Sequence, residues 1–204
     1  MTKTLPVPRL SPLSADHTPE LGEAFAAARK MLGFVPNAML ILQRKPAMVK
    51  AFMALAGTVL GPGGEVNPGF KEMIAHVVSH AAGCQYCMAH TAGGALHKGV
   101  SADKLAAILE FQSSPLFTPA ERAALACASA AASAPNAVTD ELFAGMKQHW
   151  SEEQVVEIVA VISLFGFLNR FNDTMATPLE DEPLAVGRQH LVAQGWDPAR
   201  HMRS

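Results

Sequence analysis

Charged residues and cysteines are scarce in this chain of 204 residues. Lysine, arginine, aspartate and glutamate make up 17% of it, and the formal net charge is −2. This charge gives no electrostatic reason to expect a nucleic-acid partner, and no block of like charges suggests a surface for polyanions. Three cysteines, an odd and small number, do not fit a disulfide-stapled secreted scaffold.

A hydrophobic run long enough to cross a membrane is also lacking. The longest uncharged apolar run, from Ile158 to Asn169, stops at about a dozen residues, against the roughly 18 of a membrane helix. The first seventeen residues lack the apolar stretch of a secretory signal. We therefore expect a cytoplasmic protein without a membrane partner. Half of all residues are nevertheless hydrophobic, which favours apolar surface buried between the subunits of a homo-oligomer.

Alternation of β-branched and polar residues is almost absent, whereas alanine and leucine abound. The sequence thus predicts an all-α fold, one compact multi-helix domain over residues 1–204 with no sheet. It would comprise an extended proline-containing arm (1–17), a core with the reactive side chains (about 35–135) and C-terminal helices (139–204). Helices are expected over 18–32, 47–60, 68–83, 84–98, 102–111, 119–134, a short segment from 139, 151–167 or beyond, and 183–194.

The segment from Glu72 to His90 carries most of the chemically reactive side chains. Two residues separate Cys84 from Cys87, a spacing at which two thiols can close a small disulfide ring. Gly83 supplies a break that would put Cys84 at a helix start, where unpaired N–H groups and the helix dipole favour a thiolate. His90 follows Cys87 by one turn on the same face and can accept or relay its proton.

Three further ionisable side chains, Glu72, His76 and His80, recur at four-residue spacing and share one helix face. If the C-terminal end of that helix faces Cys84, the face directs an ionisable column toward the cysteine pair. We expect His76 to be a satisfied or exposed residue. We expect His80 and the only tyrosine, Tyr86, to line the site as wall residues.

Two other interpretations of the cysteine pair stay open at this point, namely buried structural thiols and a zinc site. Cys-x-x-Cys-x-x-His offers soft ligands, but structural zinc usually takes a second ligand pair from elsewhere. The one remaining cysteine, Cys127, lies in a run of small residues typical of core packing. We therefore expect no metal and no bound cofactor. Glu121-Arg122 follows Thr118 as in a capping box and only secondarily suggests support for a site.

The segment that begins at Glu72 is similar to a later segment of the chain. Residues 72–79 align with 157–164, and the continued register sets Asn169 and Asn172 at the positions of Cys84 and Cys87. This fits either a duplicated helical unit or a chance likeness of alanine-rich helices.

The segment resembles the alkyl hydroperoxidase D and carboxymuconolactone decarboxylase superfamily, in particular its peroxidase-related branch with Cys-x-x-Cys. The resemblance rests on a glutamate twelve residues before the first cysteine, on Cys-x-Tyr-Cys and on the histidine shortly after it. It extends over residues 32–99, 119–122 and 195–198. In the best-known pattern the histidine follows the second cysteine by four residues; here Thr91 stands there, and His90 comes one earlier.

The resemblance implies an all-α homo-oligomer, a trimer or a hexamer. It implies that Cys87 attacks the peroxide, that Cys84 resolves the product, and that Glu72 and His90 relay the proton. The implied function is reduction of organic hydroperoxides by a dithiol–disulfide cycle, which a dithiol reductant protein or lipoamide would restore. The alternatives are a non-catalytic redox- or metal-sensing oligomer and a carboxymuconolactone decarboxylase-like enzyme, although the decarboxylases lack this cysteine pair.

Overall fold

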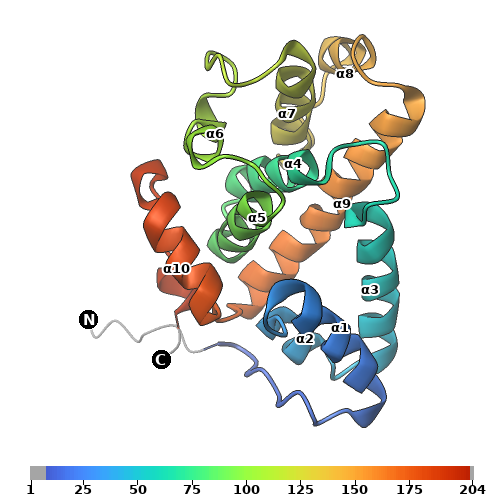
Figure 1. The fold of residues 1–204 in the computed structure, drawn as a ribbon, viewed down its shortest axis with the longest axis vertical. Coiled ribbons are helices and arrows are strands. Elements are labelled where there is room, and N and C mark those ends of the chain that lie inside the picture. The colour runs from blue at the N-terminus through green and yellow to red at the C-terminus, as the bar shows by residue number, and fades with distance from the viewer. Residues whose placement is uncertain (1–7, 203–204) are drawn as a thin grey trace.

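A computed structural model describes residues 8–202, and over this range the protein is helical with no strand (Figure 1). This confirms the expected all-α fold. The ten α-helices of the described range are α1 (Gly22–Leu32), α2 (Asn37–Leu42), α3 (Pro46–Leu60), α4 (Pro68–Ala81), α5 (Gln85–His97), α6 (Ala102–Ala106), α7 (Pro119–Ala131), α8 (Asp140–Lys147), α9 (Glu152–Met175) and α10 (Asp181–His190). Short 3-10 turns occur at Pro19–Leu21, Ile108–Glu110, Val192–Gln194 and Ala199–His201. Of the expected arm, residues 1–7 lie outside the described range, and residues 8–17 form no helix.

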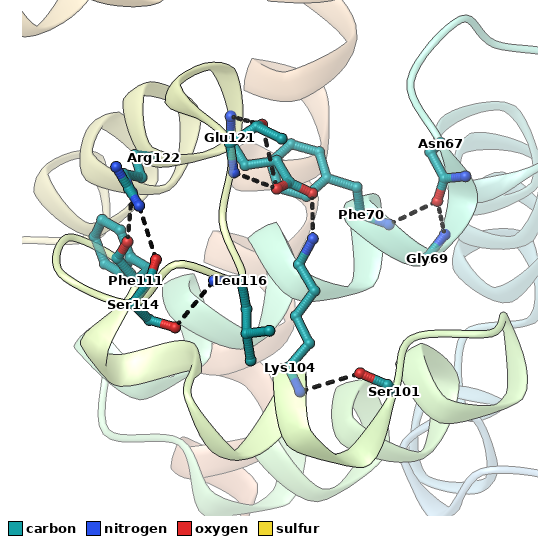
Figure 2. Close-up of polar contacts among 11 residues, drawn as sticks. Asn67, Gly69, Phe70, Ser101, Lys104, Phe111, Ser114, Leu116, Glu121 and Arg122 are labelled. Carbon is teal, nitrogen blue, oxygen red and sulfur yellow. Dashed lines mark hydrogen bonds and ion pairs between the residues drawn. The ribbon is translucent and has the colours of Figure 1, made fainter.

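Capping side chains start the helices where the sequence predicted them. Asn67 accepts hydrogen bonds from the N–H groups of Gly69 and Phe70 at the start of α4 (Figure 2). At the start of α7, Thr118 and Glu121 form a reciprocal capping box. Glu121 also pairs with Lys104 at 2.7 Å. The predicted structural role of this helix start is therefore confirmed.

Helix α2 is the one α-helix that the sequence did not predict. It has only six residues, and no side chain of its own segment caps it. The N–H of Asn37 instead donates to the carboxylate of Glu180 at 2.5 Å. A partner 143 residues away in the chain leaves no local signal. Helix α10 also differs, since it begins at Asp181 and ends at His190, earlier than predicted.

The centre of the molecule is α4, which packs against α5, α7 and α9. Every residue from Gly69 to Ser79 is buried, including the charged and polar ones. Helix α9 runs from α8 at one end to the α1–α3 group at the other (Figure 1) and contacts α3, α4, α5, α7 and α8. By length and composition α9 could also cross a membrane, although it packs against five other helices.

A buried ion pair fastens the α3–α4 connection to α9. Lys71 is fully buried, and its ammonium pairs with Glu157 while donating to the carbonyl of Val59 at 2.8 Å. The Glu157 carboxylate also accepts the N–H groups of Glu65 and Val66 at 2.9 and 3.1 Å. Every donor in this cluster thus has a charged or carbonyl partner, as a buried charge requires.

The C-terminal segment lies along α5, where it shapes the site. Helix α10 contacts α5, and Gly187 leaves room for the ring of Trp196, which would lie 2.4 Å from an added Cβ. The indole N–H of Trp196 donates to the carbonyl of Gln85 at 2.9 Å. These contacts hold the residues before α10, among them Glu180, against the first turns of α5.

Candidate active site

Cys84 stands at the start of α5, as the sequence predicted. Gly83 has φ +74°, a left-handed conformation that ends α4 and that glycine adopts without strain. The N–H of Cys84 then donates back to the carbonyl of Ser79 at 3.0 Å, and its own carbonyl accepts the N–H of Met88. Cys84 is the N-cap residue of α5, so both thiols belong to the first turn of this helix.

Both cysteines are buried free thiols, with Cys84 0% and Cys87 2% exposed. Burial raises the pKa of Cys87 well above its usual range, and the adjacent Cys84 adds to the rise. The side-chain N–H of Asn172 on α9 donates to Sγ of Cys87 at 3.4 Å and acts in the opposite direction. Cys87 is therefore a thiol at neutral pH, and its reaction requires a proton acceptor.

The carboxylate that meets His90 is Glu180. Its Oε2 lies 2.7 Å from Nε2 of His90, and its Oε1 accepts the hydroxyl of Tyr86 at 2.8 Å. The two rings stack along α5 with centroids 4.3 Å apart. Burial favours a protonated Glu180, but His90 and the hydrogen bond from Asn37 outweigh it and hold its pKa below the usual value.

Tyr86 serves this cluster as a hydrogen-bond donor. Burial, followed by the negative charge of Glu180, raises the pKa of Tyr86 well above its usual value. The phenol thus keeps its proton and donates a hydrogen bond to Glu180. Tyr86, Glu180 and His90 form a connected chain of acid–base groups beside the first turn of α5, which we call the Glu180 relay.

Residues from both ends of the described chain enclose the Glu180 relay. Phe34 meets His90 edge-on with ring centroids 5.7 Å apart. The ring centroid of His201 lies 5.8 Å from that of Tyr86. Nδ1 of His201 forms a hydrogen bond with the carbonyl of Thr177 at 2.8 Å. Burial lowers the pKa of His201, which favours a neutral ring.

Glu72 lies near α5 but pairs with Lys98, at 2.5 Å. Its carboxyl group rests on Gly94, where an added Cβ would lie 2.7 Å from it. Burial raises the pKa of Glu72, and Lys98 and His90 counter the rise. The carboxyl group of Glu72 thus lies against α5 one turn beyond His90, close enough for the two charges to interact. The contact of Glu72 is Lys98, and its part in a relay stays a prediction.

The expected column of Glu72, His76 and His80 does not form a continuous path to the thiols. His80 is exposed on the last turn of α4, and its place in the site wall stays a prediction. His76 is fully buried, and burial lowers its pKa to about 4, so that it is neutral. Its Nδ1 lies 3.0 Å from the hydroxyl of Thr91, which donates to the carbonyl of Cys87 at 2.8 Å.

Sequence reasoning missed Glu180, Lys98 and Asn37. Asp181 and Glu182 follow Glu180 directly and are exposed, and nothing in the local pattern distinguishes the buried acid from these two. Asn172 had a signal, since the internal alignment had set it at the position of Cys87. Among residues 8–202, no three histidine, cysteine or acidic side chains converge as metal ligands.

Comparison with known proteins places this site in a family. The profile of the Carboxymuconolactone decarboxylase family matches residues 46–130, which contain Glu72, both site cysteines and His90. A structure of the debrominase Bmp8, a variant with alanine in place of one cysteine in complex with 2,3,4-tribromopyrrole, is 34% identical with a TM-score of 0.82. The alignment covers 88% of this chain and 96% of that one.

Two further relatives extend the comparison. A peroxidase-related protein with an alkylhydroperoxidase AhpD core from Ralstonia eutropha JMP134 shares the fold, with a TM-score of 0.72 at 24% identity over 88% of this chain and 97% of that one. The uncharacterized protein YnjA of Escherichia coli K12 is 30% identical over 115 residues, which cover 56% of this chain and 63% of that relative. The fold is that of the AhpD-like proteins, and the paired thiols lie in the segment that the family profile matches. The chain belongs to the alkyl hydroperoxidase D and carboxymuconolactone decarboxylase superfamily.

Proposed function

We propose that this protein is a thiol-dependent peroxidase that reduces organic hydroperoxides through a Cys84/Cys87 dithiol–disulfide cycle. The observation that carries the proposal is the placement of both free thiols in the first turn of one helix. The Glu180 relay beside them supports it further. Thiol, imidazole, carboxylate and phenol are the parts needed for attack by sulfur with controlled proton transfer.

In the first step the Cys87 thiolate attacks the terminal oxygen of the hydroperoxide. The S–O bond forms as the O–O bond breaks, so that sulfur is oxidised to the sulfenic acid and the alkoxide leaves. The alkoxide takes a proton from His90, which Glu180 holds at 2.7 Å, and departs as the alcohol. The N–H of Asn172 stabilises the thiolate, and a proton acceptor such as His90 must first remove the Cys87 proton.

In the second step Cys84 attacks Sγ of Cys87. The S–S bond forms, hydroxide leaves and is protonated to water, and the pair becomes a disulfide. An external dithiol, either a reductant protein or lipoamide, then returns two electrons and two protons. Per cycle, one hydroperoxide and one dithiol give one alcohol, one water and one disulfide. No resident cofactor takes part in this scheme.

Reductive debromination is a second candidate function, because the debrominase Bmp8 is 34% identical over 88% of this chain. The same thiols balance that reaction. Cys87 would take bromine from carbon as a sulfenyl bromide, and the carbanion left behind would be protonated by the relay. Cys84 would then displace bromide to form the disulfide. The two candidates differ in the bond that breaks, O–O or C–Br, and not in the redox chemistry of the protein.

The experiment is a turnover assay with lipoamide, thioredoxin and dithiothreitol as alternative donors. We expect cumene hydroperoxide to be consumed over many cycles by the native protein and by Cys127→Ser, a matched change of a thiol outside the site. Cys87→Ser should show no turnover. Release of bromide from a brominated pyrrole, without consumption of peroxide, would establish the second candidate. A single oxidation without turnover would indicate a sensor.

A further inference from the structure

The side chain of Asn172 on α9 lies against the sulfur of Cys87 with only half of its amide engaged. Its Nδ2 donates to Sγ of Cys87 at 3.4 Å. The residue is 1% exposed, and its Oδ1 has no hydrogen-bond partner among residues 8–202. Buried carbonyl oxygens in proteins are nearly always paired. An acceptor without a donor therefore belongs to the same amide that contacts the sulfur of the proposed cycle.

Contacts on both sides fix the surroundings of this sulfur. Asn172 lies in the last turn of α9, a helix that packs against α5, and its main-chain carbonyl accepts the N–H of Thr177 at 3.0 Å. Cys84 and Cys87 are close enough for their thiols to form a hydrogen bond. The sulfur of Cys87 thus has the second thiol beside it on its own helix and the amide of Asn172 beside it on α9.

Oxidation of Cys87 would supply the donor that Oδ1 of Asn172 lacks. A thiol is a weak donor and a thiolate is none, whereas a sulfenic acid carries an O–H group bonded directly to the sulfur. This oxygen stays on the protein after the alcohol has left. Its surroundings are therefore those of Sγ, whatever route the peroxide takes to the thiol. The O–H group is formed one bond from an atom that the amide of Asn172 already contacts.

We propose that Asn172 is a positioning residue, which accepts the O–H of the Cys87 sulfenic acid through Oδ1 and directs this intermediate to Cys84. The inference rests on the proposed function. A hydrogen bond donated by the neutral form disfavours ionisation, so the intermediate stays a sulfenic acid and does not become a sulfenate. The neutral form is the electrophile of the second step. Cys84 attacks its sulfur, the S–O bond breaks, and the oxygen leaves as water once it is protonated.

The competing reaction is a second oxidation of the same sulfur. A sulfenate attacks another hydroperoxide through its sulfur, the O–O bond breaks, and a sulfinate and an alcohol are formed. The sulfur gives up two more electrons to the peroxide, and a dithiol donor does not reverse this step. Because Asn172 keeps the proton on the sulfenic oxygen, it favours the disulfide over the sulfinic acid. Its substitution should change the ratio of these two products.

The test measures the ratio of sulfinic acid to disulfide at Cys87 after excess cumene hydroperoxide, by peptide mass spectrometry. Asn172→Leu removes both hydrogen-bonding atoms and should raise this ratio several-fold to about tenfold, because one buried hydrogen bond is lost. Asn172→Asp keeps a carbonyl acceptor in either protonation state and should stay within about twofold of the native ratio. Asn169→Leu changes a buried amide one turn earlier in α9 that bonds to neither sulfur. This matched control should behave as the native protein does.

A second measurement keeps Asn172 itself and decides the matter if Asn172→Leu does not fold. In Cys84→Ser treated with one equivalent of peroxide, the NMR signal of the side-chain carbonyl carbon of Asn172 should move as the sulfenic acid forms. The corresponding signal of Asn169 should stay in place. An unmoved Asn172 signal, or a ratio that Asn169→Leu or Asn172→Asp raises as much as Asn172→Leu, would overturn this inference alone. If no sulfenic acid forms on Cys87, the proposed function is overturned with it.

Discussion

Nε2 of His90 lies 2.7 Å from Oε2 of Glu180, although 90 residues separate the two in the chain. The resemblance to the family rests on a different carboxylate, Glu72, and the structure pairs that one with Lys98. Glu180 lies outside residues 46–130, the part of the chain that the family profile matches. The imidazole is therefore oriented by a residue that the shared segment does not contain.

Glu180→Gln should lower kcat/KM for peroxide by about 10²-fold, the range expected when an acid–base group loses its support. Glutamine keeps the size of the side chain but cannot hold the charge that orients His90. His90→Gln should cost at least as much. Stopped-flow measurement of the first oxidation step gives the rates. Glu182→Gln, at an exposed neighbouring position, is the control. A rate for Glu180→Gln within twofold of the native protein would exclude the relay.

Glu72→Gln tests the carboxylate that the family motif implies. If Glu72 relays protons with His90, its loss should also slow the attack roughly 10²-fold. If its role is the ion pair with Lys98, Glu72→Gln and Lys98→Met should both lower the free energy of unfolding and should change the rate of attack less. Comparing the two variants in the same stopped-flow assay, with urea unfolding of each, separates these roles.

The sequence was sufficient for the fold and for the cysteine pair because both depend on local signals. Asn67, Thr118 and Ser151 cap helices that begin within one residue of their predicted starts, and Gly83 ends α4 where its φ requires. The contacts of α2 and Glu180 join residues more than 140 apart. A contact over such a distance leaves no local sequence pattern. The sequence around Asn37 therefore could not reveal α2, and the sequence around Glu180 could not reveal the role of this carboxylate.

Mild oxidation should join Cys84 to Cys87 and leave Cys127 free, because only the first two share one helical turn. The measurement is mass spectrometry of peptides after one equivalent of peroxide, with loss of two hydrogens in the peptide that holds both. In Cys84→Ser, dimedone should label Cys87 as a sulfenic acid. Label on Cys84 in Cys87→Ser, with none in Cys84→Ser, would reverse the two roles. A bond from Cys84 to Cys127 would contradict the assignment altogether.

The reactivity of Cys87 should increase with pH up to at least pH 9. Burial raises its pKa well above the usual value, so the thiolate is a small fraction at pH 7 and grows about tenfold per pH unit below the pKa. Alkylation by iodoacetamide, measured for each cysteine by mass spectrometry, should follow that slope. Asn172→Leu removes the N–H donated to the sulfur and should slow alkylation at every pH. A plateau for Cys87 below pH 8 would contradict the raised pKa.

Glu157→Gln should lower the free energy of unfolding by about 3–5 kcal/mol, because it leaves the fully buried ammonium of Lys71 without its counter-charge. Urea denaturation followed by circular dichroism measures the loss. Glu153→Gln, an exposed change in the same helix, should stay within about 0.5 kcal/mol. Equal stability of the two variants would mean that Lys71 does not depend on this partner.

We expect a homo-oligomer, because large apolar side chains remain exposed on three helices. Met31 on α1 is 67% exposed, Leu55 on α3 55% and Val156 on α9 69%, and a partner subunit would remove such apolar side chains from water. Multi-angle light scattering at micromolar concentration should give a multiple of 21.6 kDa. Val156→Glu should shift the mass downward if α9 contributes to the contact. A stable species of 21.6 kDa in the native protein would refute the expectation.

The arrangement of the relay also affects the protein while it is being made. Translation proceeds at roughly 5–20 residues per second, and Glu180 is added 90 residues after His90. For about 5–18 seconds the nascent chain carries Cys84 and Cys87 before the residues that cover α5 have been synthesised. During that interval the thiols are open to any oxidant and to any partner chain. The newborn polypeptide is therefore the form most vulnerable to misdirected disulfides, and a reducing environment matters to it before it matters to the folded protein.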